Sequence, residues 1–431
     1  MGPGPISQGD SYPTSRGSVA LPSRASRGTK LGPKQLIAGL LGAVVFSLLG
    51  GSMMLASAQA VPNAKPLMAE DVFKNVQLLR GISVKEFMET MGFFAAATNS
   101  TCTVCHGDAS AGSWANYALD TPLKQTARKM ILMVNALNQS YFGGKREVTC
   151  YSCHRNADRP EVTPNLAEQY ASPPPEDPAE IPEQAPGAPT PDQVFDKYLQ
   201  ALGGAQKLAG FTSFVAKGTY QGYIDPEARP VEIRAKAPGQ VFQIVHGPDG
   251  DSTWVDDGRA AWVAQPALEA PVPLLALKAG DLDGAHLESQ LYFPARIKQL
   301  LTNLHVGFPI QGTFSILPDR AGAGIDDRKL TIMQGTTAAG NKVKLYFDPK
   351  SGLLVRMVRD TSLPVGFITT EIDYADYREV SGIKIPFRVT KTWVDGRSIT
   401  LLDSVQLNVP VDAKQFAEPA APVQPKAGAG G

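Results

Sequence analysis

The sequence predicts a multidomain fold, in which a mainly α segment precedes an α+β domain with a curved antiparallel sheet. In residues 61–171 apolar side chains recur at helical spacing, and after residue 192 they alternate with the period of two that is typical of strands. Between these parts, residues 172–191 contain eight prolines, which predicts an extended, semi-rigid linker. The chain of 431 residues is long enough for two or three domains, and its net charge of zero gives no basic field that would attract nucleic acid.

The first 60 residues predict attachment to a membrane. Residues 1–35 are rich in Gly, Ser, Pro and Arg without apolar periodicity, which predicts a disordered basic tail. Residues 36–60 carry no charge and are long enough to span a bilayer as a helix. Because the cations precede this run, residues 61–431 are expected in the periplasm. The stretch Ala56–Ala60 also fits the cleavage site of a signal peptide, but the apolar run exceeds the usual 7–15 residues or so, which favours a single-pass anchor in the cytoplasmic membrane.

All four cysteines of the chain lie in two copies of one short motif. Each copy reads C-x-x-C-H, and this spacing is typical of covalent haem attachment. The two thiols form thioethers with the vinyl groups of one porphyrin, and the adjacent histidine binds the iron. The sequence therefore predicts a dihaem cytochrome c domain with two covalently bound c-type haems. The attaching residues would be Cys102, Cys105, Cys150 and Cys153, and the iron-binding histidines His106 and His154.

Two other readings of the cysteine pairs are open. The four thiols could bind structural zinc, but Cys150 follows Cys105 by 45 residues, a wider gap than in most zinc ribbons. Zinc ribbons also do not need a histidine directly after each pair. A thioredoxin-like redox pair would need a βαβ setting, which this segment does not show.

The dihaem segment contains an internal repeat. Ser83–Glu86 is a capping box that opens a helix, and the first C-x-x-C-H motif follows it. Thr121-Pro122 provides an N-cap and a first-turn proline for a second helix, which Gly143-Gly144 can end before the second motif. Each half therefore reads as a helix that carries Met-x-x-Met, a loop and a haem motif.

Methionine is the expected second axial ligand of each iron. Residues 61–170 contain no histidine outside the two motifs, because His246, His286 and His305 all follow the linker. The soft ligands that remain on the two helices are Met88, Met91, Met130 and Met133. Methionine on an amphipathic helix is often simple core filler. A thioether opposite histidine would stabilise ferrous iron and close it to substrates, which favours electron transfer over catalysis.

The dihaem segment resembles the photosynthetic reaction-centre cytochrome subunit, a tetrahaem family that re-reduces the special pair. About 90 of the 431 residues take part. The resemblance is carried by four stretches, Asn75–Leu79, Glu86–Met91, Ala127–Met133 and Val148–Arg155.

This resemblance implies which methionines bind iron. The family's axial methionine closes a Glu-Phe-x-x-x-Met pattern, which falls on Met91, and the next follows Ala-Arg-x, which falls on Met130; Met88 and Met133 are the alternatives. Only one haem pair is present where the family has two. The family's extra axial histidine has no counterpart near Phe142, consistent with the loss of the haem that it would serve.

The C-terminal part is expected to fold as an antiparallel β-rich domain over residues 192–416, followed by a disordered tail over 417–431. Thr190–Gln193 is a capping box, and Asp257-Gly258 and Asp395-Gly396 are hairpin signals. A short apolar helix is expected near 294–304. The stretch from Tyr374 to Phe387 weakly resembles lipoprotein carriers, whose fold is a curved sheet with covering helices. No catalytic constellation stands out in this part.

Three functions are compatible with these features. The first is a membrane-anchored electron carrier that takes electrons from a soluble or quinol-linked donor and passes them to a membrane redox complex, above all a photosynthetic reaction centre. The second is a respiratory periplasmic dihaem carrier or a dihaem peroxidase-like enzyme, and a peroxidase would need one open iron. The third is a periplasmic carrier of apolar ligands, with the haem segment as an appendage.

Overall fold

The computed structural model describes residues 66–107, 114–164, 181–222, 227–266, 271–311 and 329–422. The chain divides into two compact units, Met1–Val61 and Pro62–Gly431, and all described residues belong to the second. The expected basic tail and the expected membrane span over 36–60 lie outside the described residues. Within the ranges described, no helix combines the length and the apolar character needed to cross a bilayer.

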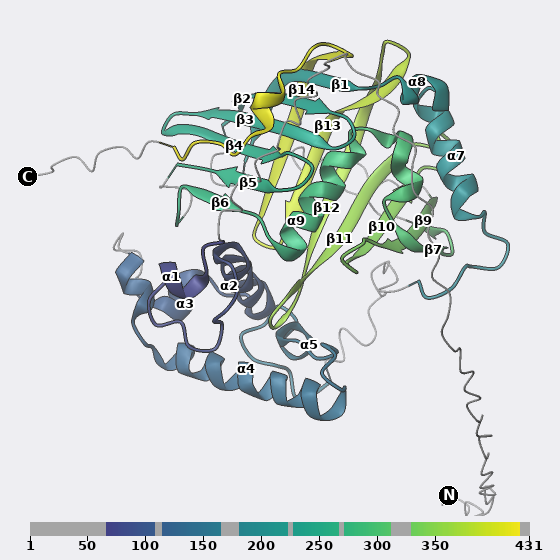
Figure 1. Cartoon of the computed structure of the whole chain (residues 1–431). Coiled ribbons are helices and arrows are strands. Elements are labelled where there is room, and N and C mark those ends of the chain that lie inside the picture. The colour runs from purple at the N-terminus through teal and green to yellow at the C-terminus, as the bar shows by residue number, and fades with distance from the viewer. Residues whose placement is uncertain are drawn as a thin grey trace, which may run out of the picture. The chain divides into compact units, whose positions relative to one another are not determined.

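One antiparallel sheet of fourteen strands dominates this unit (Figure 1). The order is β6-β5-β4-β3-β2-β1-β14-β13-β12-β11-β10-β9-β7, with β8 paired to β9. Most neighbours in the sheet are also neighbours in the chain, but β1 pairs with β14, so the first and last strands lie side by side. The first seven strands are β1 (Ser213–Gln221), β2 (Arg229–Lys236), β3 (Gln240–Gly247), β4 (Gly250–Asp256), β5 (Ala261–Ala264), β6 (Leu274–Ala276) and β7 (Thr302–Val306). The others are β8 (Ile310–Gln311), β9 (Lys329–Thr336), β10 (Lys342–Phe347), β11 (Leu354–Leu363), β12 (Gly366–Val380), β13 (Ile383–Trp393) and β14 (Gly396–Leu407).

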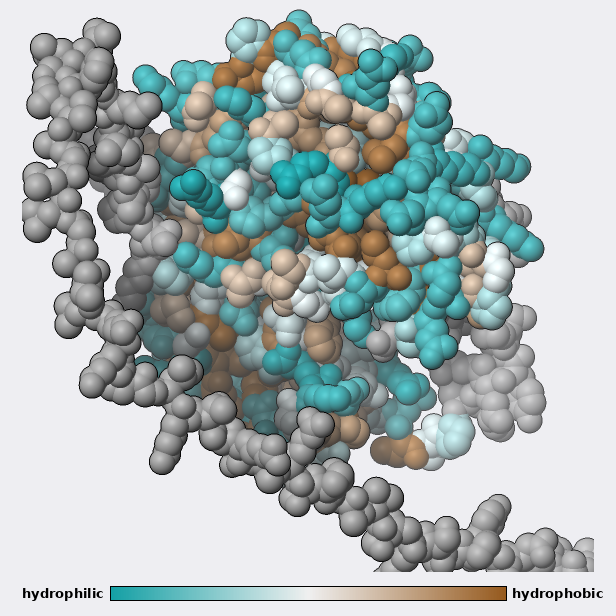
Figure 2. Space-filling model, turned by 45° about the vertical axis from the view of Figure 1, so that its right-hand side comes forward, coloured by the Kyte–Doolittle hydropathy of each residue, from teal (hydrophilic) through white to brown (hydrophobic). Residues whose placement is uncertain are grey.

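The main hydrophobic core lies between this sheet and helices that follow the dihaem segment. Strand β2 shows how the alternating pattern builds it, because Val231, Ile233 and Ala235 point to one face and are all buried. Helix α7 (Pro191–Leu202) starts at the expected Thr190 capping box and places Phe195 and its neighbours against β10. The remaining elements here are α8 (Ala205–Ala209), α9 (Ala279–Leu291), η3 (Pro294–Gln299) and η4 (Ala413–Phe416). On the face seen in Figure 2 hydrophilic side chains predominate, with apolar ones in small groups between them.

The haem motifs lie among short helices that precede the sheet. These are α1 (Ala69–Val72), α2 (Val84–Thr98), α3 (Cys102–His106), η2 (Trp114–Ala118), α4 (Pro122–Tyr141) and α5 (Cys150–His154). Two of them begin where the sequence predicts. The Ser83 hydroxyl accepts the N–H of Glu86 at the start of α2, and the Thr121 hydroxyl accepts the N–H of Lys124 at the start of α4.

The expected fold class, a multidomain chain with a mainly α dihaem cytochrome c domain beside an α+β domain, is wrong. A large antiparallel sheet dominates the described chain, and helices are few. The physical reason is that the helices around the haem motifs do not enclose a core of their own. Their buried side chains complete a cluster with residues of β11 and β12. The members of this cluster are Leu79, Phe93, Ala97, Ile131, Cys150, Leu363, Val365 and Ile368.

Two local expectations for the β-rich part are also corrected. The apolar helix expected near 294–304 is a short 3-10 helix, η3, and strand β7 occupies the rest. The sequence pattern did not reveal α9, which contains two glycines and is only weakly amphipathic. A Cβ at Gly284 would lie 2.4 Å from the Arg359 guanidinium carbon, so a larger residue there would require the Arg359 side chain to move.

Residues 181–190, at the end of the proline-rich stretch, pack on the sheet. Ile181 is 5% exposed, and its N–H donates to Gln334 on β9 at 3.2 Å. Residues 172–180 lie outside the described part of the chain.

Candidate haem-binding site

The first haem motif forms helix α3, directly after α2. Asn99 ends α2 in the left-handed region at φ 52°, which turns the chain into the motif. The Nδ1 atom of His106 lies 2.9 Å from the carbonyl oxygen of Tyr117. If Nδ1 donates its hydrogen to this carbonyl, Nε2 keeps its lone pair for a metal. Burial lowers the pKa of His106, opposed in part by the Tyr117 hydrogen bond, so the neutral imidazole that binds iron is favoured.

Helix α4 holds this arrangement in place through its first turn. The Thr121 hydroxyl donates to the carbonyl of Cys105 at 2.6 Å, and the Lys124 ammonium donates to the carbonyls of Tyr117 and Leu119 at 2.8 and 2.7 Å. The carbonyl that meets His106 is therefore itself fixed by a cation. The imidazole ring has a defined orientation as a result.

The second haem motif repeats this arrangement on α5. Thr149 and Ser152 form a capping box, in which each side chain meets the backbone N–H of the other. The Nδ1 atom of His154 lies 3.0 Å from the carbonyl oxygen of Ala157. In both motifs a backbone carbonyl therefore engages Nδ1 and leaves Nε2 for a ligand.

The four cysteines differ in exposure. Cys102 and Cys153 are exposed, Cys105 is half-buried and Cys150 is buried. Burial raises the pKa of Cys105 and raises that of Cys150 to about 11, so both stay protonated thiols at neutral pH. No three His, Cys, Asp or Glu side chains in the described ranges gather as a metal ion would require. The structure therefore does not bring the two cysteine pairs together at one zinc site.

The methionines of α4 lie on an uncovered apolar stripe. Leu123, Met130, Met133 and Tyr141 are spaced so that they share one side of the helix, and all four are exposed. The buried side of α4 lies beside this stripe and carries Ile131, Val134 and Asn138. An apolar helix stripe left uncovered by protein needs another apolar group against it.

On α2 the candidate methionines are less exposed. Met88 and Met91 are both half-buried, and Met91 packs against the cluster that contains Cys150. The fully buried side of α2 carries Thr90, Phe93 and Ala97.

The helices that carry the methionines contact the helices that carry the haem motifs. Helix α3 contacts α4, and α5 contacts both α2 and α4. Ile131, next to Met130, shares a cluster with Cys150, so Met130 projects from the turn of α4 that lies beside the second motif. The role of each methionine as an iron ligand stays a prediction.

The residues of this segment fit a c-type haem. Three of the large apolar side chains that are exposed in the described chain, Phe308, Phe367 and Leu401, lie in the β-rich part, and all the others lie within residues 66–164. A segment with two thiols and an imidazole in each motif, together with uncovered apolar surface, has the donors and the surface that a covalently bound porphyrin requires.

Sequence reasoning did not identify several residues that shape the site. Asn138 is 7% exposed, and its side chain makes three hydrogen bonds to the backbone of Glu147 and Val148, just before α5. Asn138 could have been found from the sequence, because it is a polar residue on the buried side of an amphipathic helix. The carbonyls of Tyr117 and Ala157 carry no such signal, because any residue type provides a carbonyl.

Two of the solved structures similar to this chain have names of the lipoprotein-carrier type. One is a putative outer membrane lipoprotein-sorting protein domain from Vibrio parahaemolyticus, at 8% identity and a TM-score of 0.35, covering 52% of this chain and 97% of the other. Another is a LolA superfamily protein from Nitrosomonas europaea, at 14% identity and a TM-score of 0.34, covering 53% and 98%. Their names agree with the resemblance seen in the C-terminal sequence, and no argument about function rests on them.

Curated relatives match the haem segment instead. The photosynthetic reaction center cytochrome c subunit of Thermochromatium tepidum is 35% identical over 97 residues, covering 22% of this chain and 23% of the relative. The subunit of the same name from Roseobacter denitrificans is 29% identical over 107 residues, covering 23% and 28%. The chain thus matches less than a third of the length of these relatives. Residues 49–181, which contain both C-x-x-C-H motifs, match the model of the photosynthetic reaction centre cytochrome C subunit family, and this confirms the resemblance seen in the sequence.

Proposed function

We propose that this protein is a dihaem c-type cytochrome that transfers electrons to a membrane redox complex, with a photosynthetic reaction centre as the first candidate. The observation that carries the proposal is the pair of C-x-x-C-H helices, in each of which a backbone carbonyl engages Nδ1 of the histidine. The family match of residues 49–181 supports the choice of a reaction centre as acceptor.

In this proposal the chain attaches, orients and encloses the two haems. Cys102 and Cys105 attach one haem, and the corresponding pair of α5 attaches the other. His106 and His154 would bind iron through Nε2, and the hydrogen bond at Nδ1 would raise the basicity of the ring and fix its plane. Each haem supplies a one-electron redox centre when bound.

The proposed sixth ligands are the thioether sulfurs of Met91 and Met130. A methionine ligand favours ferrous iron and raises the reduction potential. It also occupies the position that a peroxide substrate would need. We therefore propose an electron carrier rather than an enzyme.

The proposed location follows from the first 60 residues. Residues 36–60 would anchor the chain in the cytoplasmic membrane as a single helix, and the haem and β-rich parts would lie in the periplasm. There they could receive electrons from a soluble or quinol-linked donor. Comparing the mass of the mature protein in membranes with that of the full chain distinguishes an anchor from a cleaved signal peptide.

The number of haems and their ligands can be tested residue by residue. The pyridine haemochrome of the purified protein should give two haems per chain, and Cys102→Ser or Cys153→Ser should each weaken the covalent retention of one haem. Met91→Leu and Met130→Leu should each lower one reduction potential and remove one methionine-to-iron charge-transfer band. The matched controls Met88→Leu and Met133→Leu should change neither potential. If the controls change a potential and the first two variants do not, the assignment of the ligands is wrong.

Flash absorption spectroscopy on native membranes tests the acceptor. Rapid bleaching of the reduced haem α-band after a flash would show direct donation to a reaction centre. If light causes no bleaching while a quinol-linked donor reduces the haems in the dark, a respiratory relay replaces this proposal. Binding of cyanide to the oxidised protein without unfolding would instead indicate an open iron and a peroxidase-like enzyme.

A further inference from the structure

The turn between β11 and β12 is buried, although a two-residue hairpin turn normally faces solvent. The residues concerned, 362–368, are called the β11–β12 tip below. Leu363 pairs with Gly366 at the end of the hairpin, and Pro364-Val365 forms the turn. Leu363 and Val365 are each only 1% exposed. Tips of hairpins are usually exposed and polar, so these two side chains must be covered by another part of the chain.

The covering residues come from the dihaem segment. The cluster that holds Leu363 and Val365 also contains Phe93 and Ala97 of α2 and Cys150 of α5. Gly366 lies so close to α2 that a Cβ there would be 2.3 Å from the Phe93 ring. The β11–β12 tip therefore packs directly against α2, and Cys150 of α5 belongs to the same buried cluster.

A second turn of the sheet also meets α2. A Cβ added to Gly92 would lie 3.0 Å from a carboxylate oxygen of Asp395 and 3.1 Å from the Val394 side chain. Both of these residues belong to the connection between β13 and β14. Helix α2 thus packs closely against the ends of two adjacent hairpins.

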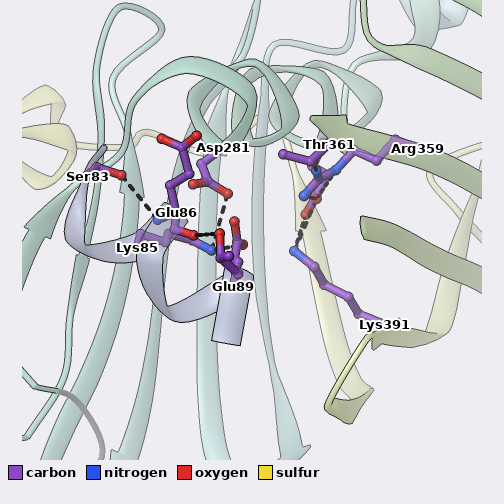
Figure 3. Close-up of polar contacts among 10 residues, drawn as sticks. Ser83, Lys85, Glu86, Glu89, Asp281, Arg359, Thr361 and Lys391 are labelled. Atoms are coloured by element: carbon purple, nitrogen blue, oxygen red, sulfur yellow. Dashed lines mark hydrogen bonds and ion pairs between the residues drawn. The ribbon is translucent and has the colours of Figure 1, made fainter. Parts of the chain in front are cut away.

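Polar contacts join α2 to α9 and the loop before α5 to the β11–β12 tip. The Lys85 ammonium on α2 lies 3.2 Å from Asp281 on α9 and also pairs with Glu89, one turn further along α2 (Figure 3). Burial opposes the charge of Lys85, but the two carboxylates outweigh it and raise the pKa of this lysine. Arg146, in the loop before α5, donates to the Ser362 hydroxyl and lies 5.6 Å from the centre of the Phe367 ring. The β11–β12 tip therefore has polar as well as apolar contacts with the haem segment.

We propose that the β11–β12 tip is a positioning element that fixes the two haem sites relative to each other. It packs against α2, which carries the proposed ligand Met91 of the first haem, and α2 in turn contacts α5, which carries the cysteines and histidine of the second. A hydrogen bond also joins α2 to the end of α5: the N–H of Asn156 donates to the Ala97 carbonyl at 3.0 Å. The tip fills the space on the buried side of α2, in the cluster that also holds Cys150, and this inference rests on the proposed function.

The test compares two leucines of equal burial. Leu363→Ala removes a side chain of the tip, and Leu330→Ala removes one that is also 1% exposed but lies in a different cluster, with Ile332 and Tyr346. Both variants are made in the full chain and loaded with haem in cells. The readouts are haem content, the circular dichroism of the Soret band and the two reduction potentials. Two neighbouring haems give a split Soret signal whose shape depends on their mutual orientation.

We expect Leu363→Ala to keep two haems per chain while changing the split Soret signal and shifting at least one potential. Leu330→Ala should leave both haem readouts as in the wild type, although its melting temperature falls to a similar extent. Unchanged haem readouts in Leu363→Ala, or equal changes in both variants, would overturn the positioning role.

A milder variant keeps the inference testable if Leu363→Ala does not fold. Arg146→Gln removes the contacts with Ser362 and Phe367 without opening a cavity, and it should change the split Soret signal in the same direction. An unaltered signal in this variant would count against the proposal. A wild-type protein that contains fewer than two haems would instead refute the proposed function, so the two failures are distinguishable.

Discussion

Asn138 is expected to be the polar residue on which the second haem motif depends most. Its side-chain nitrogen donates to the Val148 carbonyl at 2.7 Å. Its side-chain oxygen accepts the N–H groups of Glu147 and Val148 at 3.1 and 2.9 Å. These three bonds close the loop between α4 and α5, and Thr149 then caps α5.

Asn138→Ala removes all three bonds while leaving the helical backbone intact. A hydrogen bond contributes about 0.5–1.5 kcal/mol net, and a buried group left without a partner costs about 1–3 kcal/mol. Glu147 is exposed, so water can replace part of what is lost. The expected loss in the free energy of unfolding is therefore about 2–4 kcal/mol. The loop bears directly on α5, so the potential of the second haem should shift more than that of the first.

The matched control is Asn135→Ala, the same change on the same helix at an exposed position. It should alter stability by less than about 0.5 kcal/mol. The free energy of unfolding is measured by guanidinium denaturation followed by circular dichroism, and the potentials by spectroelectrochemical titration. If Asn138→Ala and Asn135→Ala have equal stability and equal potentials, the assignment of a structural role to the Asn138 side chain is refuted.

Two further predictions concern the β-rich part. Glu288 on α9 bonds to Arg359 and Lys391; burial opposes its charge, but these two cations outweigh it and lower the pKa of Glu288. Glu288→Gln leaves two cations facing each other and should lower the free energy of unfolding by about 2–3 kcal/mol in a thermal melt. The control Glu379→Gln, at an exposed position, should change it very little. Equal melting temperatures of the two variants would contradict this prediction. His286 lies 2.9 Å from the buried carboxylate of Asp256, whose hydrogen bond raises the pKa of His286 against the opposing effect of burial. A raised pKa in the folded state stabilises the fold at pH values below about 6.5, and this contribution disappears as the pH rises through the folded-state pKa. His286→Gln should therefore destabilise the protein at pH 5.5 and much less at pH 9, and an equal effect at both pH values would contradict the pairing.

Local signals in the sequence predicted local structure well. Ser83, Thr121 and Thr190 mark the starts of three helices, because a capping hydroxyl acts on backbone groups two or three residues away. Asp257-Gly258 falls between β4 and β5, and Asp395 lies in the turn before Gly396, the first residue of β14, for the same reason. The haem motifs likewise depend only on spacing within five residues.

What the sequence could not reveal depends on residues distant in the chain. Phe93 of α2 shares a buried cluster with Val365, and nothing in the sequence of either stretch predicts that they lie together. The fold class was wrong for this reason, since the haem segment was expected to bury its own apolar residues. Helix α9 was missed because Gly284, which looks like a helix breaker, lies in it to make room for Arg359 of strand β11.

The burial of Cys150 in one cluster with the β11–β12 tip has a consequence for the order of events during synthesis. Chains grow at about 5–20 residues per second, so residues 362–368 appear roughly 10–40 s after residues 150–154. The sheet also cannot be completed before β14 is made, because β14 pairs with β1. During this interval the cluster around Cys150 lacks Leu363, Val365 and Ile368, so the thiol is less enclosed than in the finished fold. In the proposed dihaem protein, covalent attachment at Cys150 would therefore precede the completion of this cluster by the late hairpin.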